Sequence, residues 1–208
     1  ILSSEIGALN LTQNNNLLDI RVWNSQIKIM DLPENKHTEP HFFNQKILID
    51  ETSIGQLNMP FDCQFNEITI SNGKLLKLRI PDLCTVEKLI VHRNGLSEFF
   101  VNENVQIKTL NLQSNQLKGL DISKLQGLNN LLVSGNQLTF LTMPLSSTEF
   151  KRLEIAQNPV PLSQVLMKNM PLEIIVSEDQ YDVVFSLKYF FYNAQKQDGF
   201  YILRKDSH

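Results

Sequence analysis

The amino-acid sequence repeats with a period of 21 residues, and this period restricts the possible folds more than any other feature. The residue that closes each copy of a short apolar pattern stands at positions 54, 75, 96, 117, 138, 160 and 181. The spacings between these positions are 21, 21, 21, 21, 22 and 21 residues. A period of roughly 20–50 residues is typical of solenoids, in which each repeat forms one coil that packs on its neighbours.

The apolar pattern within each copy is that of a leucine-rich repeat. In Ile107–Leu117 and Leu128–Leu138, the clearest copies, apolar residues occupy the first, fourth, sixth and eleventh positions, and Asn occupies the ninth. This Asn turns the chain out of a strand, and its side chain can hydrogen-bond backbone groups of the next coil. The ninth position reads Thr52, Gly73, Asn94, Asn115, Asn136, Asn158 and Asp179. We therefore predict an α/β solenoid, a leucine-rich-repeat horseshoe with a parallel β-sheet of about seven or eight strands on its concave face.

The sequence predicts a single leucine-rich-repeat domain over residues 1–208, with the repeats in residues 44–160 and a cap at each end. Residues 1–43 form the N-terminal segment and cap. Within this cap, residues 17–32 alternate apolar and polar side chains on both sides of Asn24–Gln26, which is typical of a β-hairpin. Residues 1–16 are expected to be loosely structured.

Residues 161–208 are expected to form a degenerate repeat and a partly helical C-terminal cap. Apolar residues at helical spacing predict two short helices, one over residues 162–170 and one over residues 184–194. Residues 181–208 also contain 8 of the 17 aromatic residues. These rings either close the end of the core or form a contact patch for a partner or for dimerisation with a second copy of the chain.

Composition and charge argue against several functional classes. Hydrophobic residues make up 42% of the chain, and the formal net charge of −3 comes from scattered charged residues. No charge run indicates nucleic-acid or membrane-surface binding, and no apolar stretch approaches the ~18 residues of a transmembrane helix. Two Cys and four His argue against a Cys/His metal cluster, and no catalytic or phosphate-binding motif is present. We therefore expect no catalytic activity, no metal and no cofactor.

Two kinds of side chain could still suggest catalysis. His92 lies on a predicted strand face, where a lone His is expected to be a contact residue rather than a base. Asp50 and Glu67 could form a carboxylate pair, but alternating charges on a binding face explain them better.

Cys63 and Cys84 lie one period apart and occupy the same position in adjacent coils. Neighbouring strands lie about 5 Å apart, and a disulfide requires Cα atoms about 4.4–6.8 Å apart. The spacing therefore predicts a Cys63–Cys84 disulfide, and the alternative is two buried free thiols. Asn10-Leu11-Thr12 is a glycosylation sequon, so Asn10 is a candidate glycosylation site, in agreement with secretion.

Between the core positions of each strand, side chains point outward onto the predicted concave face. Aliphatic residues recur there at every second coil, at Leu48, Ile90, Leu132 and Ile175. They reflect either the β propensity of aliphatic residues or the apolar anchors of a protein-binding surface. The predicted partner-binding residues are Lys46, Leu48, Asp50, Glu67, Lys88, Ile90, His92, Asn111, Gln113, Leu132, Arg152 and Glu154.

Segments at both ends of the repeats resemble the mosquito leucine-rich immune proteins. The resemblance is carried by Leu17–Val22, Phe43–Asp50, the step formed by Ile54, Leu57 and Pro60, and Asn158–Leu162. It covers roughly residues 17–185 and implies a secreted haemolymph protein of innate immunity that binds complement-like thioester proteins. Those proteins usually close the C-terminal cap with Cys residues and continue into a coiled coil, whereas this chain has neither feature.

Together, these patterns predict an extracellular recognition module that binds a protein partner, or a pathogen surface, through its concave face. The start at Ile1 rather than Met agrees with a mature secreted form or a trimmed chain. The alternative is an intracellular leucine-rich-repeat scaffold or regulatory subunit that also binds a protein. The state of the two Cys distinguishes the two hypotheses, because a structural disulfide belongs to an oxidising compartment.

Overall fold

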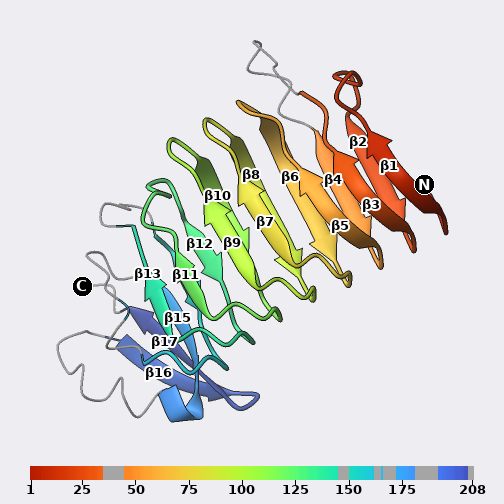
Figure 1. Ribbon diagram of the computed structural model, residues 1–208. Coiled ribbons are helices and arrows are strands. Elements are labelled where there is room, and N and C mark those ends of the chain that lie inside the picture. The colour runs from red at the N-terminus through yellow and green to blue at the C-terminus, as the bar shows by residue number, and fades with distance from the viewer. Residues whose placement is uncertain (35–44, 145–149, 162–164, 166–171, 181–191, 206–208) are drawn as a thin grey trace.

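The computed structural model describes residues 1–34, 45–144, 150–161, 165, 172–180 and 192–205. In this part of the chain, the backbone winds into a β-solenoid whose coils stack side by side from the N-terminal to the C-terminal end (Figure 1). Each central coil contributes one strand to a long sheet and a second strand to a shorter sheet. The predicted solenoid is therefore confirmed.

The long sheet has ten strands within the described residues, in the order β16-β17-β15-β14-β12-β10-β8-β6-β4-β2. The strands from β2 to β15 pair in parallel, each about one repeat after its neighbour, so that Ile68 of β6 pairs with Leu89 of β8. This pairing confirms the predicted parallel sheet. The parallel strands are β2 (Asp19–Trp23), β4 (Lys46–Asp50), β6 (Gln64–Ser71), β8 (Thr85–His92), β10 (Gln106–Asn111), β12 (Asn130–Leu132), β14 (Arg152–Glu154) and β15 (Glu173–Ser177).

The second strand of each coil was not predicted from the sequence. These strands form three shorter parallel sheets: β1 (Glu5–Asn10) with β3 (Gln26–Asp31) and β5 (Ser53–Asn58), β7 (Lys77–Ile80) with β9 (Glu98–Val101), and β11 (Gly119–Asp121) with β13 (Phe140–Thr142). They occupy the place of the helices in an α/β solenoid. The predicted α/β class is therefore wrong, since only Glu178–Gln180 are helical among the described residues.

The predicted N-terminal hairpin is also wrong. β2 and β3 follow one another in the sequence, but β2 pairs with β4, whereas β3 pairs with β1 and β5. Asn24, between them, has a φ of 46° and turns the chain through a corner of the coil. Alternation of apolar and polar residues indicates a strand but does not identify its pairing partner. The strand β1 also corrects the expectation that residues 1–16 are loose.

An antiparallel hairpin, β16 (Tyr192–Gln197) and β17 (Phe200–Lys205), closes the C-terminal end of the long sheet. β17 pairs with β15, and Leu203 is buried opposite Ile174, where it covers the end of the core. Ala194, which was expected in a helix, therefore lies in a strand. Apart from Ala194 and Val165, the residues that suggested the two helices lie outside the described part of the chain.

A ladder of buried polar side chains follows the long sheet at the corner of each coil. Asn136 shows its geometry: its Oδ1 accepts a hydrogen bond of 3.1 Å from the amide of Leu117. Its Nδ2 donates hydrogen bonds of 2.9 Å to the carbonyl oxygens of Leu112 and Val133. The same arrangement, in which Oδ1 accepts from an amide of the preceding coil, recurs at Asn94, Asn115 and Asn158. The prediction that these Asn side chains hydrogen-bond the backbone of a neighbouring coil is confirmed, but that coil is the preceding one and not the next.

Both ends of the ladder differ from its centre. At the N-terminal side, Oγ1 of Thr52 accepts from the amide of Ser25 in the preceding coil and donates to the carbonyl oxygen of Asp50, but a hydroxyl group has no second hydrogen to donate to the preceding coil. At Gly73, a Cβ atom would clash with the carbonyl oxygen of Thr52. At the C-terminal side, the predicted Asp179 is exposed and Gln180 takes its place. The buried Nε2 of Gln180 donates a 2.9 Å hydrogen bond to the carbonyl oxygen of Asn158.

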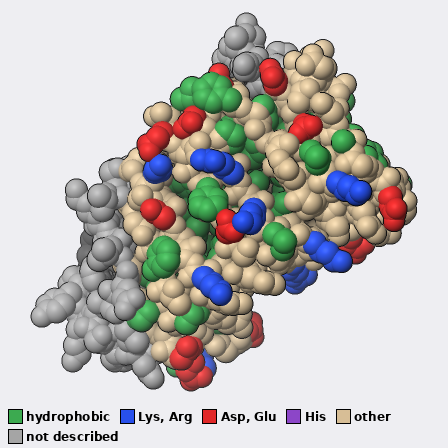
Figure 2. Space-filling model, viewed as in Figure 1, with side chains coloured by type: hydrophobic (Ala, Val, Ile, Leu, Met, Phe, Trp, Pro, Cys, Tyr) green, Lys and Arg blue, Asp and Glu red, His purple; other side chains and the backbone are tan. Residues whose placement is uncertain are grey.

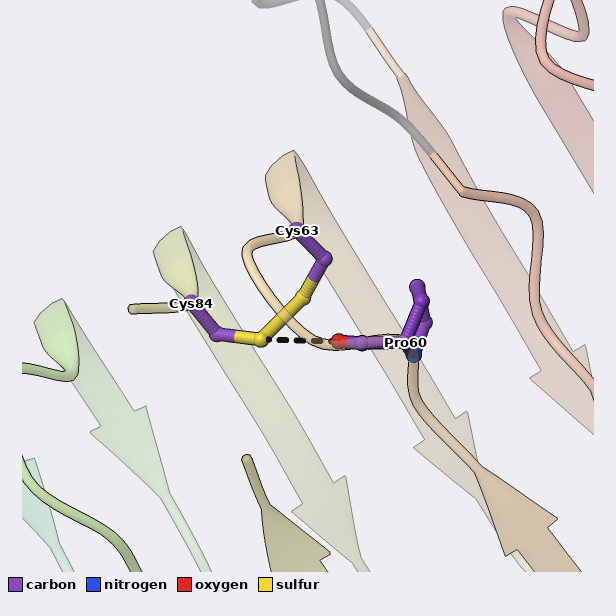
Figure 3. Close-up of a disulfide and its surroundings, with 3 residues drawn as sticks. All are labelled: Pro60, Cys63 and Cys84. Atoms are coloured by element: carbon purple, nitrogen blue, oxygen red, sulfur yellow. Dashed lines mark hydrogen bonds between the residues drawn. A yellow bond between two sulfur atoms is a disulfide. The ribbon is translucent and has the colours of Figure 1, made fainter. Parts of the chain in front are cut away.

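Cys63 and Cys84 are joined by a disulfide, as predicted, with Cα atoms 4.5 Å apart (Figure 3). Each Cys immediately precedes a long-sheet strand, β6 or β8, and both are fully buried. The Sγ atom of Cys84 lies 3.2 Å from the carbonyl oxygen of Pro60. The bond therefore joins the coil of β6 covalently to the coil of β8.

Candidate functional site

The predicted partner-binding residues all lie on the outward face of the long sheet, and none of the twelve is buried. They alternate along each strand with core residues: Ile47 and Ile49, on either side of Leu48, are 1% and 0% exposed. The parallel pairing aligns them in columns, so that Leu48 pairs with Thr69 and Thr69 pairs with Ile90. The structure therefore places these residues on one face, and their binding of a partner stays a prediction.

This face is hollowed toward its C-terminal end, where an open cavity of about 830 Å³ lies over the strands from β8 to β17. Five of the predicted residues line this hollow: His92, Asn111, Gln113, Arg152 and Glu154. The other predicted residues are not part of its lining: Lys46, Leu48, Asp50, Glu67, Lys88, Ile90 and Leu132. The structure thus brings together the C-terminal part of the predicted set.

The sizes of neighbouring side chains explain the hollow. Along the C-terminal ends of the strands, the large side chain of Gln113 is followed in the next coils by the small Ser134 and Ala156. Phe200 and Ile202 of β17 line the far side. Small residues between large ones leave a depression in an otherwise continuous sheet surface.

Of the residues that β17 contributes, Phe200 belongs to the aromatic segment that was considered as a contact patch, whereas Ile202 and Arg204 were missed in the sequence analysis. Phe200, Ile202 and Arg204 line the hollow, although they stand outside the 21-residue repeat. Because β17 runs antiparallel to β15, no repeat position assigns its residues to a face. The alternation of these residues with the buried Leu203 is the signal that could have identified them.

A network of paired charges forms the floor of the hollow. Nε2 of Gln113 donates a 2.8 Å hydrogen bond to Oε2 of Glu154, whose other oxygen lies 2.6 Å from a guanidinium nitrogen of Arg152. Arg152 also lies 3.5 Å from Glu173, and Arg204 lies 3.0 Å from the second oxygen of Glu173. Each carboxylate is held by arginine, so the floor is polar, ordered and internally neutral.

Asp50 and His92 belong to a second polar cluster, next to the hollow. Oδ1 of Asp50 accepts hydrogen bonds of 2.6 Å from Ser71 Oγ and 2.8 Å from Asn72 Nδ2. The bond from Ser71 is the main cause that lowers the pKa of Asp50. Burial lowers the pKa of His92, and the charge of Arg93 lowers it further, against the opposite effect of Asp50. At pH 7, Asp50 is therefore ionised and His92 is neutral.

The described residues contain neither a facing pair formed by Asp50 and Glu67 nor a group of side chains that could bind a metal ion. Asp50 pairs with Ser71, whereas Glu67 pairs with Lys46 at the other end of the strands, so the two carboxylates do not face one another. Within the described residues, no three His, Cys, Asp or Glu side chains are grouped so that they could hold a metal ion.

The shorter sheets carry exposed aromatic residues, but their surroundings are different. Phe140 of β13 lies over Gly119 of β11, where a Cβ atom would clash with its ring. Lys77 of β7 forms an ion pair with Glu98 of β9 across two coils. On the face drawn in Figure 2, hydrophobic side chains stand singly among charged ones rather than gathering into one patch. The hollow is therefore the stronger candidate site.

Two further features bear on the environment of the chain. Asn10 is exposed at the end of β1, and its Oδ1 accepts hydrogen bonds from the amide and the hydroxyl group of Thr12, at 2.9 and 2.7 Å. Its glycosylation stays a prediction. No helix in the described part of the chain is long and apolar enough to cross a membrane.

Comparison with protein-family models, with curated proteins and with solved structures finds no match to this chain. The resemblance to the mosquito leucine-rich immune proteins is therefore untested. The same holds for the innate-immune role and for the complement-like partner that this resemblance implies.

Proposed function

We propose that the protein is an extracellular leucine-rich-repeat recognition module, which binds a protein partner through the outward face of its long sheet and catalyses no reaction. The hollow over β8 to β17 is the observation that carries this proposal. Protein interfaces combine an apolar centre with a polar rim. The hollow also offers both kinds of contact, although its apolar residues Ile175, Phe200 and Ile202 form one wall beside amide, hydroxyl and ion-paired side chains.

The order of the hollow before binding also supports a recognition role. Arg152 and Glu154 are already held in one geometry by each other and by Gln113. Side chains that are ordered in advance lose less conformational entropy when a partner binds. A preorganised polar floor with an apolar wall therefore favours specific binding by surface complementarity.

The repeat and the disulfide support the remaining parts of the proposal. The 21-residue period and the buried ladder Asn residues favour the leucine-rich-repeat identity. The bonded state of Cys63 and Cys84 favours an extracellular protein over an intracellular scaffold.

A capture experiment with matched variants tests the binding proposal. The purified chain is used as bait in extracellular fluid of the source organism, beside Ser134→Trp, which fills the hollow, and Ser97→Trp, an exposed position just before β9. We expect wild type and Ser97→Trp to capture the same protein, and Ser134→Trp to lose it at an unchanged melting temperature. Equal capture by both variants would move the site away from the hollow.

The proposed extracellular location is tested by the redox state of Cys63 and Cys84. Protein from its natural source is alkylated without reductant and analysed by mass spectrometry. We expect Cys63 and Cys84 to resist alkylation until a reductant is added. Two alkylated thiols in the unreduced protein would favour the intracellular scaffold instead.

A further inference from the structure

We infer that the hollow receives a short extended segment of the protein partner, which crosses the strands of the long sheet. This segment carries an acidic residue at the β8 end, a bulky apolar residue near β17, and a basic residue at the turn between β16 and β17. The inference rests on the proposed function and adds the chemistry of the segment that the hollow recognises.

Two charged side chains without an ion pair mark the ends of the hollow. Arg93 lies at the corner after β8, and Asp198 lies in the turn between β16 and β17. Among the described residues, neither of them forms an ion pair. By contrast, the carboxylates of Glu154 and Glu173 both pair with Arg152. The positive and the negative charge left for a partner therefore lie at opposite ends of the hollow.

Both ends lie along the same edge of the sheet. Arg93 follows the C-terminal end of β8, and the antiparallel pairing places the start of β17 beside the C-terminal end of β15, with Phe200 opposite Ser177. Asp198 lies two residues before this start. A segment that meets both charges must therefore run across the strands rather than along one of them.

The apolar side chains of the hollow gather near one of its ends. Ile175 of β15 pairs with Ile202 of β17, and Phe200 lies two residues before Ile202 on the same strand face. Toward β8, the lining changes to Ser134 and to amide side chains. A bulky apolar residue of the partner therefore buries its side chain near β17, and polar residues fill the part that leads to Arg93.

The width of the sheet sets the length of the segment. From β8 to β17 the strand order β8-β10-β12-β14-β15-β17 contains five steps. At about 4.8 Å per step this is about 24 Å, and at about 3.4 Å per extended residue it corresponds to about seven residues. The hollow thus suits a heptapeptide with an acidic end and a basic end.

Selection from a phage-displayed library of random heptapeptides tests this inference on the full chain. Wild type should enrich peptides with an acidic residue at one end and an apolar residue followed by a basic one at the other. The double variant Arg93→Glu, Asp198→Lys should enrich peptides with both charges reversed. Glu is compatible with the corner, because Glu51 occupies the same corner of another coil with a φ of 47°.

Matched variants on the shorter sheets provide the control. Arg79→Glu on β7 and Asp121→Lys on β11 make the same charge changes away from the hollow and should leave the enriched peptides unchanged. A peptide enriched on wild type should bind the reversed double variant at least about fivefold more weakly, as expected for two partly exposed charge pairs. Its binding should also be lost in Ser134→Trp.

The outcomes separate the inference from the proposed function. Peptides that depend on Ser134 but show no charge preference would overturn the inference and leave the proposed function supported. A library with no enriched peptide would also overturn the inference, and the capture experiment would then decide the proposed function alone. If the double variant enriches peptides in which both charges are reversed, the result supports the inference and the proposed function.

Discussion

At the scale of single residues, the ladder side chains hold neighbouring coils together, and Asn136 provides the clearest test. In Asn136→Ala, the amide of Leu117 loses its acceptor at a site that is only 7% exposed, whereas the carbonyl oxygens of Leu112 and Val133 keep hydrogen bonds from Asn115 and Asn158. A buried polar group without a partner costs about 1–3 kcal/mol. We expect the free energy of unfolding, measured by urea denaturation, to fall by about 1–3 kcal/mol.

The neighbouring Gln137 is the control for this substitution. Gln137 is exposed, and its backbone amide, which donates to the carbonyl oxygen of Leu117, is retained in Gln137→Ala. The stability of this variant should change by less than about 0.5 kcal/mol. Equal losses in the two variants would show that the ladder bonds do not stabilise the solenoid.

His92 gives a prediction that depends on pH. Its pKa in the folded protein is lowered, first by burial and then by Arg93, so the unfolded chain binds its proton more readily. The contribution of His92 to stability is therefore fully present above its ordinary pKa of about 6.5 and is lost as the pH falls below that value. We expect wild type to lose more stability than His92→Gln between pH 8 and pH 5. An NMR titration that gave His92 a pKa above 6.5 would contradict this sign.

The ladder also shows what the sequence can predict for a single residue. The roles of Asn94, Asn115 and Asn158 followed from their type and their position in the repeat. In the last coil, however, Ser177 is followed by helical backbone, where the other coils have a corner residue with a positive φ. This change shifts the ladder by one residue, from Asp179 to Gln180, and a fixed spacing could not anticipate it.

At the scale of elements, the sequence predicted the strands that share one repeat register and missed those outside it. The strands of the shorter sheets have their own signal, since Leu78 and Ile80 recur one period later as Phe99 and Val101, all buried. Two apolar residues at a spacing of two are too few to distinguish a short strand from a loop. The pairing of β2 and β3 was mistaken because alternation alone does not show which strands are neighbours.

Strand β17 is the element whose contribution to stability is most easily measured. Leu203 is 2% exposed and lies opposite Ile174, so Leu203→Ala opens a cavity at the end of the core. Such a substitution costs about 2–5 kcal/mol. We expect the free energy of opening, measured by hydrogen exchange in β15 and β17, to fall by the same amount. Ile202→Ala, on the outward face of the same strand, should have a smaller effect. A larger loss in Ile202→Ala than in Leu203→Ala would show that Ile202, and not Leu203, faces the core.

At the scale of the whole molecule, the face that carries the candidate site could be predicted, but the hollow could not. Parallel pairing at one repeat per strand places equivalent residues in columns, so Asn111 and Glu154 could be assigned to one face from the sequence. The hollow depends on the small Ser134 and on Phe200 from an antiparallel hairpin. Neither the depth of a surface nor the position of such a hairpin follows from a repeat period.

The disulfide tests how far the coils of the solenoid depend on one another. The Cys63–Cys84 bond closes a loop with a sequence separation of 21 residues, for which the chain-entropy relation gives about 3 kcal/mol. In a solenoid each coil contacts only its neighbours, so the loss should stay close to the joined coils. In the double variant Cys63→Ala, Cys84→Ala, we expect exchange to accelerate in β6 and β8 well before β2 and β14. Reduced wild type should match the variant, and uniform acceleration along all coils would show that the solenoid unfolds as one unit instead.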